Sequence, residues 1–67
     1  MMNITLNGVA HELDADASVT DLLASLGMAG KRVAVERNGE IVPRSRHDET
    51  RLVPGDVVEI VSAVGGG

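Results

Sequence analysis

The sequence predicts an α+β domain in which a mixed five-stranded sheet packs on one helix. Three observations lead to this fold class: two pairs of short apolar runs joined by Asn-Gly dipeptides, one helical stripe of Val and Leu, and one nearly continuous apolar run before the C-terminal glycines. The chain has 67 residues, 43% of them hydrophobic, and no cysteine. We therefore expect a single domain stabilised by aliphatic packing, without disulfides.

The first predicted hairpin starts at the N-terminus. Met2–Leu6 alternates apolar and polar residues, as a strand with one buried face does, and an Asn-Gly dipeptide follows. The returning strand runs from Val9 to Leu13, and we expect these two terminal residues to face inward. His11 then lies on the same face, and we interpret it as a histidine at the margin of the sheet and not as a ligand or a base.

The predicted helix begins after Ser18, which precedes Asp21 in the S-x-x-D pattern of a helix N-terminus. Apolar residues then follow at i, i+3, i+4 and i+7, and this stripe consists of Val19, Leu22, Leu23 and Leu26. We expect Gly27 to end the helix in a left-handed conformation and Met28 to pack back on the last turn.

A second predicted hairpin consists of Val33–Arg37, another Asn-Gly dipeptide and Glu40–Val42, and Pro43 ends it. Residues 44–51 carry mixed charges, so we expect an exposed loop there. This loop contains His47 beside two carboxylates, but neighbouring residues rarely converge on one metal ion, and we predict no metal site.

The last predicted strand, residues 57–63, follows a Pro-Gly-Asp turn. Its apolar character indicates a central position in the sheet. If Val58 and Ile60 face the helix, alternation directs the candidate docking residues to the opposite face, and these are Val57, Val61 and Ala63.

The order hairpin, helix, hairpin, strand favours one topology. A right-handed crossover makes the first and last strands parallel neighbours in the centre of the sheet, which is the β-grasp arrangement of ubiquitin. We expect a β-grasp domain over residues 1–64 and a flexible glycine tail over residues 65–67.

Charge and composition argue against several classes of function. The net charge of −4 and the absence of Phe, Trp and Tyr provide neither a basic surface nor a stacking platform for nucleic acid. No apolar run approaches the roughly 18 residues of a membrane span, and the N-terminus does not resemble a signal peptide. We expect a soluble, cytoplasmic protein that is a monomer when alone.

The glycines at the C-terminus are the candidate functional segment. Without Cβ atoms, Gly65 and Gly66 can thread a channel too narrow for side chains and present the carboxylate of Gly67. Three extended residues reach roughly 10 Å. The alternative interpretation is an inert, frayed spacer.

Several segments together resemble the ThiS family of sulfur carriers. Residues 34–44 are similar to the family's "AV..N..IVPR" segment, Gly55-Asp56 precedes the last strand as in the family, and the chain ends in glycines. The third glycine is a departure from the usual Gly-Gly end.

The resemblance implies a carrier that is a co-substrate and not an enzyme, with no catalytic residue and no bound cofactor. A ThiF-like adenylating enzyme with ATP and Mg²⁺ activates Gly67, and a cysteine-derived persulfide displaces AMP. The product is a thiocarboxylate (a C-terminal 1-thioglycine), which donates sulfur to thiazole synthase (ThiG) for thiamine biosynthesis.

Three alternatives stay open at this point. A molybdopterin-type sulfur carrier shares the same chemistry, whereas a ubiquitin-like modifier would join Gly67 to lysines of target proteins. The third alternative is a plain β-grasp interaction module, in which the C-terminal glycines have no chemical role.

Overall fold

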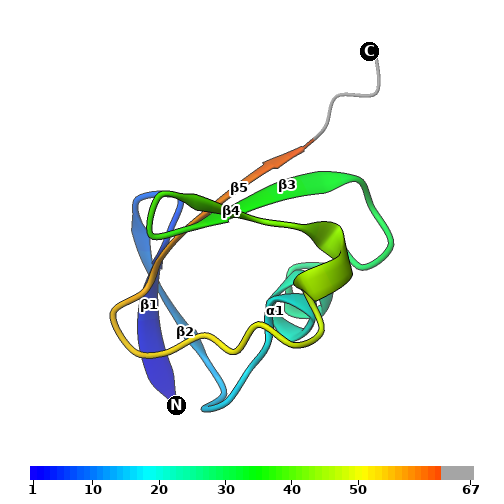
Figure 1. The fold of residues 1–67 in the computed structure, drawn as a ribbon. Coiled ribbons are helices and arrows are strands. Elements are labelled where there is room, and N and C mark those ends of the chain that lie inside the picture. Colours follow the sequence, from blue (N-terminus) through cyan, green and yellow to red (C-terminus); the bar gives the residue numbers. More distant parts are fainter. Residues whose placement is uncertain (63–67) are drawn as a thin grey trace.

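The computed structural model describes residues 1–62, which form a mixed sheet with one α-helix on one face (Figure 1). The elements in chain order are β1 (Met2–Leu6), β2 (Val9–Leu13), α1 (Val19–Ser25), β3 (Val33–Arg37), β4 (Glu40–Val42), the 3-10 helix η1 (Arg44–Arg46) and β5 (Val57–Ser62). The strand order is β2-β1-β5-β3-β4, with β5 parallel to β1 and antiparallel to β3. The predicted β-grasp arrangement, with the last strand central, is confirmed.

Both predicted hairpins form, and their turns require the Asn-Gly dipeptides. The φ angles are 49° and 83° at Asn7 and Gly8, and 52° and 85° at Asn38 and Gly39. Two consecutive positive φ angles are typical of the type I′ turn, whose twist matches that of the flanking strands. The local sequence therefore sets the register of β1 with β2 and of β3 with β4.

Helix α1 begins and ends with the motifs that the sequence predicts. The Ser18 hydroxyl accepts a hydrogen bond from the Asp21 amide at 3.1 Å, and the Asp21 carboxylate accepts one from the Ser18 amide at 3.0 Å. The hydrogen bond from the Ser18 amide to the Asp21 carboxylate is the main cause that lowers the pKa of Asp21, and the nearby Ser18 hydroxyl lowers this pKa further. At the other end Gly27 has φ of 73°, and Met28 donates to the Leu23 carbonyl at 2.8 Å, as in a Schellman motif.

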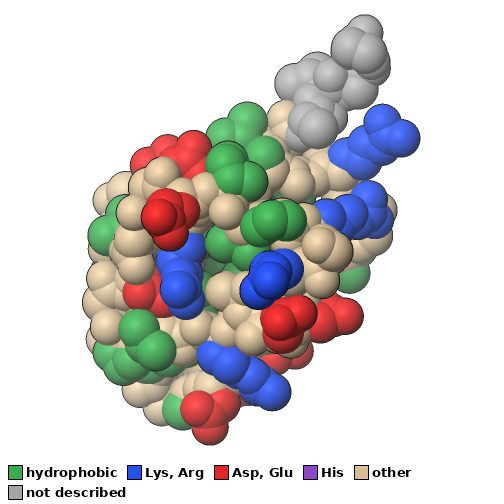
Figure 2. All heavy atoms as spheres, viewed as in Figure 1, with side chains coloured by type: hydrophobic (Ala, Val, Ile, Leu, Met, Phe, Trp, Pro, Cys, Tyr) green, Lys and Arg blue, Asp and Glu red, His purple; other side chains and the backbone are tan. Residues whose placement is uncertain are grey.

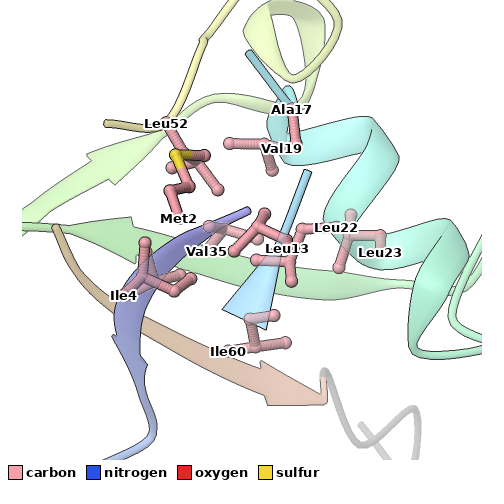
Figure 3. Close-up of a cluster of buried hydrophobic side chains, with 11 residues drawn as sticks. Met2, Ile4, Leu13, Ala17, Val19, Leu22, Leu23, Val35, Leu52 and Ile60 are labelled. Carbon is pink, nitrogen blue, oxygen red and sulfur yellow. The ribbon is translucent and has the colours of Figure 1, made fainter. Parts of the chain in front are cut away.

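The core lies between the sheet and α1 and is entirely aliphatic. Figure 3 shows side chains from four strands, the helix and two loops pointing toward one another. The largest fully buried side chains are those of Leu22, Leu52, Val19, Val35 and Val58. Leu52 belongs to no strand or helix, and the sequence pattern did not predict its place in the core.

Val9 lies on the same face of β2 as Leu13, as expected, but it is not buried there, because it is 67% exposed. Leu13 at the other end of β2 is buried, as predicted. Val9 pairs with Leu6 beside the hairpin turn, whereas the core gathers at the end of the sheet where Met2 pairs with Leu13. His11, between Val9 and Leu13 on edge strand β2, is half-buried, in agreement with its interpretation as a margin residue.

The expectation of a solvated loop over residues 44–51 is also wrong in part. The segment starts with η1, and His47 is buried, its Nε2 donating to the Val42 carbonyl oxygen at 3.1 Å. The amides of Val19 and Thr20 donate to the carbonyls of Thr50 and His47, at 3.0 and 3.2 Å. The segment is ordered because it satisfies amides in the first turn of α1, a long-range contact with no local sequence signal.

We predict that Leu52→Ala lowers the free energy of unfolding by about 2–5 kcal/mol, because it leaves a cavity in the core. Urea denaturation followed by circular dichroism measures the loss. The matched control is Val53→Ala, since Val53 is the next residue and is 52% exposed. Equal unfolding midpoints for the two variants would contradict the assignment of Leu52 to the core.

Candidate functional site

Strand β5, which leads to the glycine tail, is hydrogen-bonded on both sides. Five residues of β3 pair with it, from Val33↔Ser62 to Arg37↔Val58, and β1 pairs with its first two residues. Two further backbone bonds extend the contact on both sides. The Asn7 backbone amide donates to the Val58 carbonyl at 2.9 Å, and the Asn38 backbone amide donates to the Val57 carbonyl at 2.7 Å. The strand before the tail is therefore held in the centre of the sheet.

The side chains of the two turn asparagines also bind β5. Asn7 accepts from the Ile60 amide at 2.8 Å and donates to the Ile60 carbonyl at 3.3 Å. Asn38 accepts from the Val57 amide at 2.9 Å and donates to the Asp56 carboxylate at 3.0 Å. Each side chain thus forms hydrogen bonds with backbone groups of β5 at positions where no strand backbone pairs with them. The sequence analysis explained these asparagines by their turn conformation alone and missed this second role.

Asp56 fixes the entry to β5. Its carboxylate is buried, accepts from the Val53 amide at 2.9 Å and lies 3.9 Å from Arg37 Nη1. Asn38 donates a further bond, so the partners of this buried carboxylate come from two segments: the end of β3 with its turn (Arg37, Asn38) and the turn before β5 (Val53). A buried carboxylate is stable only when such partners are present.

The sheet face opposite α1 carries an exposed apolar patch. Val57 and Val61 are 45% and 62% exposed, whereas their neighbours Val58 and Ile60 are buried against α1. The predicted alternation along the last strand is therefore present over residues 57–62, and Ala63 lies outside the described residues. Ile41 on β4, which is 62% exposed, belongs to the same face, and the sequence analysis did not single it out.

We call this surface, formed by Ile41, Val57 and Val61, the outer patch. Ala34 extends it, because Ala34 pairs with Val61. Glu36 and Glu59 pair directly across β3 and β5 on the same face. Like charges directly opposite one another destabilise a sheet, so an apolar pair at these two positions would stabilise the fold more than the two glutamates do.

The predicted tail residues Gly65, Gly66 and Gly67 lie outside the described residues, which end at Ser62. Five residues follow Ser62, and five extended residues span at most about 18 Å. Any catalyst that acts on Gly67 must therefore approach the end of β5 closely.

Two further properties concern only residues 1–62. No three His, Cys, Asp or Glu side chains lie together in the manner of a metal site. The single α-helix of this part of the chain is too short to cross a bilayer.

The ThiS family model matches residues 4–67, which include the last strand and all three terminal glycines. The chain belongs to the ThiS family. The resemblance noted from residues 34–44 and from the turn before β5 is thereby confirmed, and the turn itself is now explained by the bonds of Asp56 and Asn38.

Individual relatives agree with the family assignment. The chain is 45% identical to the sulfur carrier protein ThiS of Bacillus subtilis, over 96% of this chain and 98% of that protein. The crystal structure of the thiamine biosynthesis protein ThiS of Geobacter metallireducens superposes with a TM-score of 0.84 at 40% identity, covering 98% of this chain and 100% of that one. This ThiS-family chain therefore shares the fold of that protein.

A second kind of relative is much longer. The chain is 42% identical over 66 residues to a thiazole synthase of Paramagnetospirillum magneticum, covering 98% of this chain but 20% of that protein. A thiazole synthase of Magnetococcus marinus matches in the same way, at 41% identity. The chain thus spans about a fifth of the length of these two relatives.

We predict that Asn38→Gly lowers the free energy of unfolding by about 1–3 kcal/mol, because two hydrogen bonds to β5 and its entry turn are lost. Glycine accepts the positive φ of this position, so the change tests the side chain and not the turn. Chemical denaturation measures the effect. Glu40→Ala in the same hairpin is the control, since the Glu40 side chain is exposed and has no hydrogen bond to residues 1–62. An unchanged midpoint for Asn38→Gly would refute the role of its side chain.

Proposed function

We propose that this chain is the sulfur carrier of thiamine biosynthesis and that Gly67 is its acyl terminus. The observation that supports this most is the match to the ThiS family through Gly67, together with 45% identity along nearly the whole sulfur carrier of Bacillus subtilis. The carrier is a co-substrate of cytoplasmic partner enzymes and holds no cofactor of its own. The cytoplasm supplies the ATP that activation requires.

Activation of the carrier starts from a carboxylate, which is a poor electrophile. On the adenylating enzyme, a Gly67 carboxylate oxygen attacks the α-phosphorus of Mg-bound ATP, and pyrophosphate leaves. The product is an acyl-adenylate whose carbonyl carbon accepts a nucleophile. Gly65 and Gly66 have no side chains, so they let this carbon pass through a narrow channel to the nucleotide.

Sulfur transfer then takes two exchanges. The terminal sulfur of a cysteine-derived persulfide on a partner attacks the acyl carbon and displaces AMP, which gives an acyl disulfide. A second thiol attacks the partner's sulfur in that disulfide, so the S–S bond breaks and a thiocarboxylate remains on Gly67. The thiols belong to the partners, because this chain contains no cysteine.

The sulfur acceptor in this proposal is thiazole synthase. Two relatives with that name each contain a segment about 41–42% identical to nearly the whole of this chain. A carrier segment and a synthase in one polypeptide remain at a high effective concentration with respect to each other. We infer that the separate carrier meets the same kind of enzyme by diffusion.

We further propose that the outer patch, extended by Ala63, is the docking face for the partner enzymes. Its valine side chains are exposed on β5, the strand that leads to the tail, and its isoleucine is exposed on β4, on the far side of β3, so a partner that receives Gly67 can cover one face of the sheet there. The Glu36 and Glu59 carboxylates on this face would then pair with a basic side chain of the partner.

Intact-mass spectrometry tests the proposed function. The carrier is incubated with the adenylating enzyme, ATP, Mg²⁺ and a cysteine desulfurase with cysteine, and we expect a mass gain of one sulfur in place of one oxygen. Gly66→Leu should abolish the gain, because its side chain blocks the channel, without changing the unfolding midpoint. Conversion of Gly66→Leu at the wild-type rate would contradict the threading role of the tail, and higher-mass protein adducts would indicate a modifier instead.

Val61→Asp should weaken docking without unfolding the domain, because the side chain is exposed and lies opposite the core. We expect the KM for the carrier in the adenylation reaction to rise about tenfold, which corresponds to about 1.4 kcal/mol of binding free energy. Val9→Asp is the matched control, since Val9 is also an exposed strand valine but lies outside the outer patch. An equal KM for both variants would argue against the outer patch.

A further inference from the structure

Positive charge is concentrated in one groove of this acidic protein. The chain has a net charge of −4 and six Lys and Arg residues, yet Lys31, Arg32 and Arg44 all line one groove of about 560 Å³ between α1 and the start of β3. Among its lining residues Asp48 is the one carboxylate, and the Thr20 hydroxyl donates to it. We call Lys31, Arg32 and Arg44 the basic cluster.

A second groove has the opposite charge. About 300 Å³ in volume, it lies beside β2 and the N-terminal part of α1, and the acidic residues that line it are Glu12, Asp14 and Asp21. No Lys or Arg is among its described lining residues. The two grooves therefore differ in the sign of the Lys, Arg, Asp and Glu side chains that predominate in their lining.

The basic cluster lies at the end of the sheet from which the tail continues. Val33 pairs with Ser62, the last described residue, and Lys31 and Arg32 immediately precede Val33. Figure 2 shows Lys and Arg side chains, in blue, beside the end of the molecule at which β5 stops in Figure 1. Lys31 and Arg32 thus adjoin the residue that pairs with Ser62, the last described residue of β5.

The length of the tail determines what these cations meet. A catalyst that holds Gly67 must come within about 18 Å of Ser62, because five residues reach no further. Whatever surface surrounds the entrance to that catalyst's active site is then brought against the residues at this end of the sheet. The basic cluster faces that surface each time the carrier is used.

We propose that the basic cluster docks on an acidic protein surface around the tail entrance of the adenylating enzyme. This inference rests on the proposed function of Gly67. The three cations are all exposed, whereas a site dedicated to a small ligand encloses most of that ligand's surface. Exposed cations around an open groove match a broad acidic surface instead.

Electrostatic attraction of this kind acts on encounter and orientation. Complementary surfaces raise association rates by about 10- to 1,000-fold, and salt suppresses the effect, since the Debye length is about 10 Å at 0.1 M. The basic cluster would therefore lower the KM for the carrier and leave the chemistry on Gly67 unchanged.

The test compares Lys31→Glu/Arg32→Glu and Arg44→Glu with wild-type carrier in the adenylation reaction at low salt. The matched control is Arg46→Glu, which makes the same charge change at an exposed arginine that does not line this groove. We expect KM to rise about tenfold or more in the cluster variants at unchanged kcat, and the difference to shrink in about 0.5 M NaCl. Circular dichroism melts verify that each variant is folded.

Three results would overturn the inference. The first is an equal KM for the cluster variants and Arg46→Glu, and the second is a KM difference that salt does not reduce. The third is saturable binding of inorganic phosphate or ATP to the isolated wild-type carrier that the cluster variants lose, which would assign the groove to a small anion. Failure of the proposed function itself is distinct, because then the wild-type carrier would not be adenylated at all.

Discussion

The fixed position of β5 in the centre of the sheet is the constraint on which the rest of the structure depends. Its backbone pairs with β1 on one side and β3 on the other, and Val58 and Ile60 anchor it to the core. A strand that is hydrogen-bonded on both sides and packed on the core is among the parts of a domain that open least readily. Ser62, the last described residue, is therefore held in a defined position relative to the core.

The hairpin turns contribute to that constraint as well as to local folding. Asn7 and Asn38 adopt the positive φ angles that type I′ turns require, and their side chains bind opposite edges of β5. Asp56 extends the same network into the turn before β5. Asn7 and Asn38 therefore have two roles, since each forms a hairpin turn and also binds β5. These two roles together fix the position of both hairpins relative to β5.

The small size of the domain decides which surface is free for partners. In residues 1–62 a single α-helix covers one face of the sheet, so the apolar residues of the other face remain exposed. The outer patch lies on β5 and β4, and the basic cluster lies just before β3 and in η1, whereas the acidic groove lies beside the edge strand β2. Apolar contact and charge are thereby arranged around the strand that leads to Gly67.

The sequence by itself determined the elements whose signals are local. The S-x-x-D cap, the apolar stripe, Gly27 and both Asn-Gly turns act within a few residues, and alternation gave the two faces of the last strand. The place of Leu52 in the core, the burial of His47 and the exposure of Val9 were decided only by the tertiary structure. Each depends on which distant segment covers the residue, and short-range periodicity contains no information about that. The gathering of Lys31, Arg32 and Arg44 has the same origin, since two separate segments meet there only after the sheet has closed around α1.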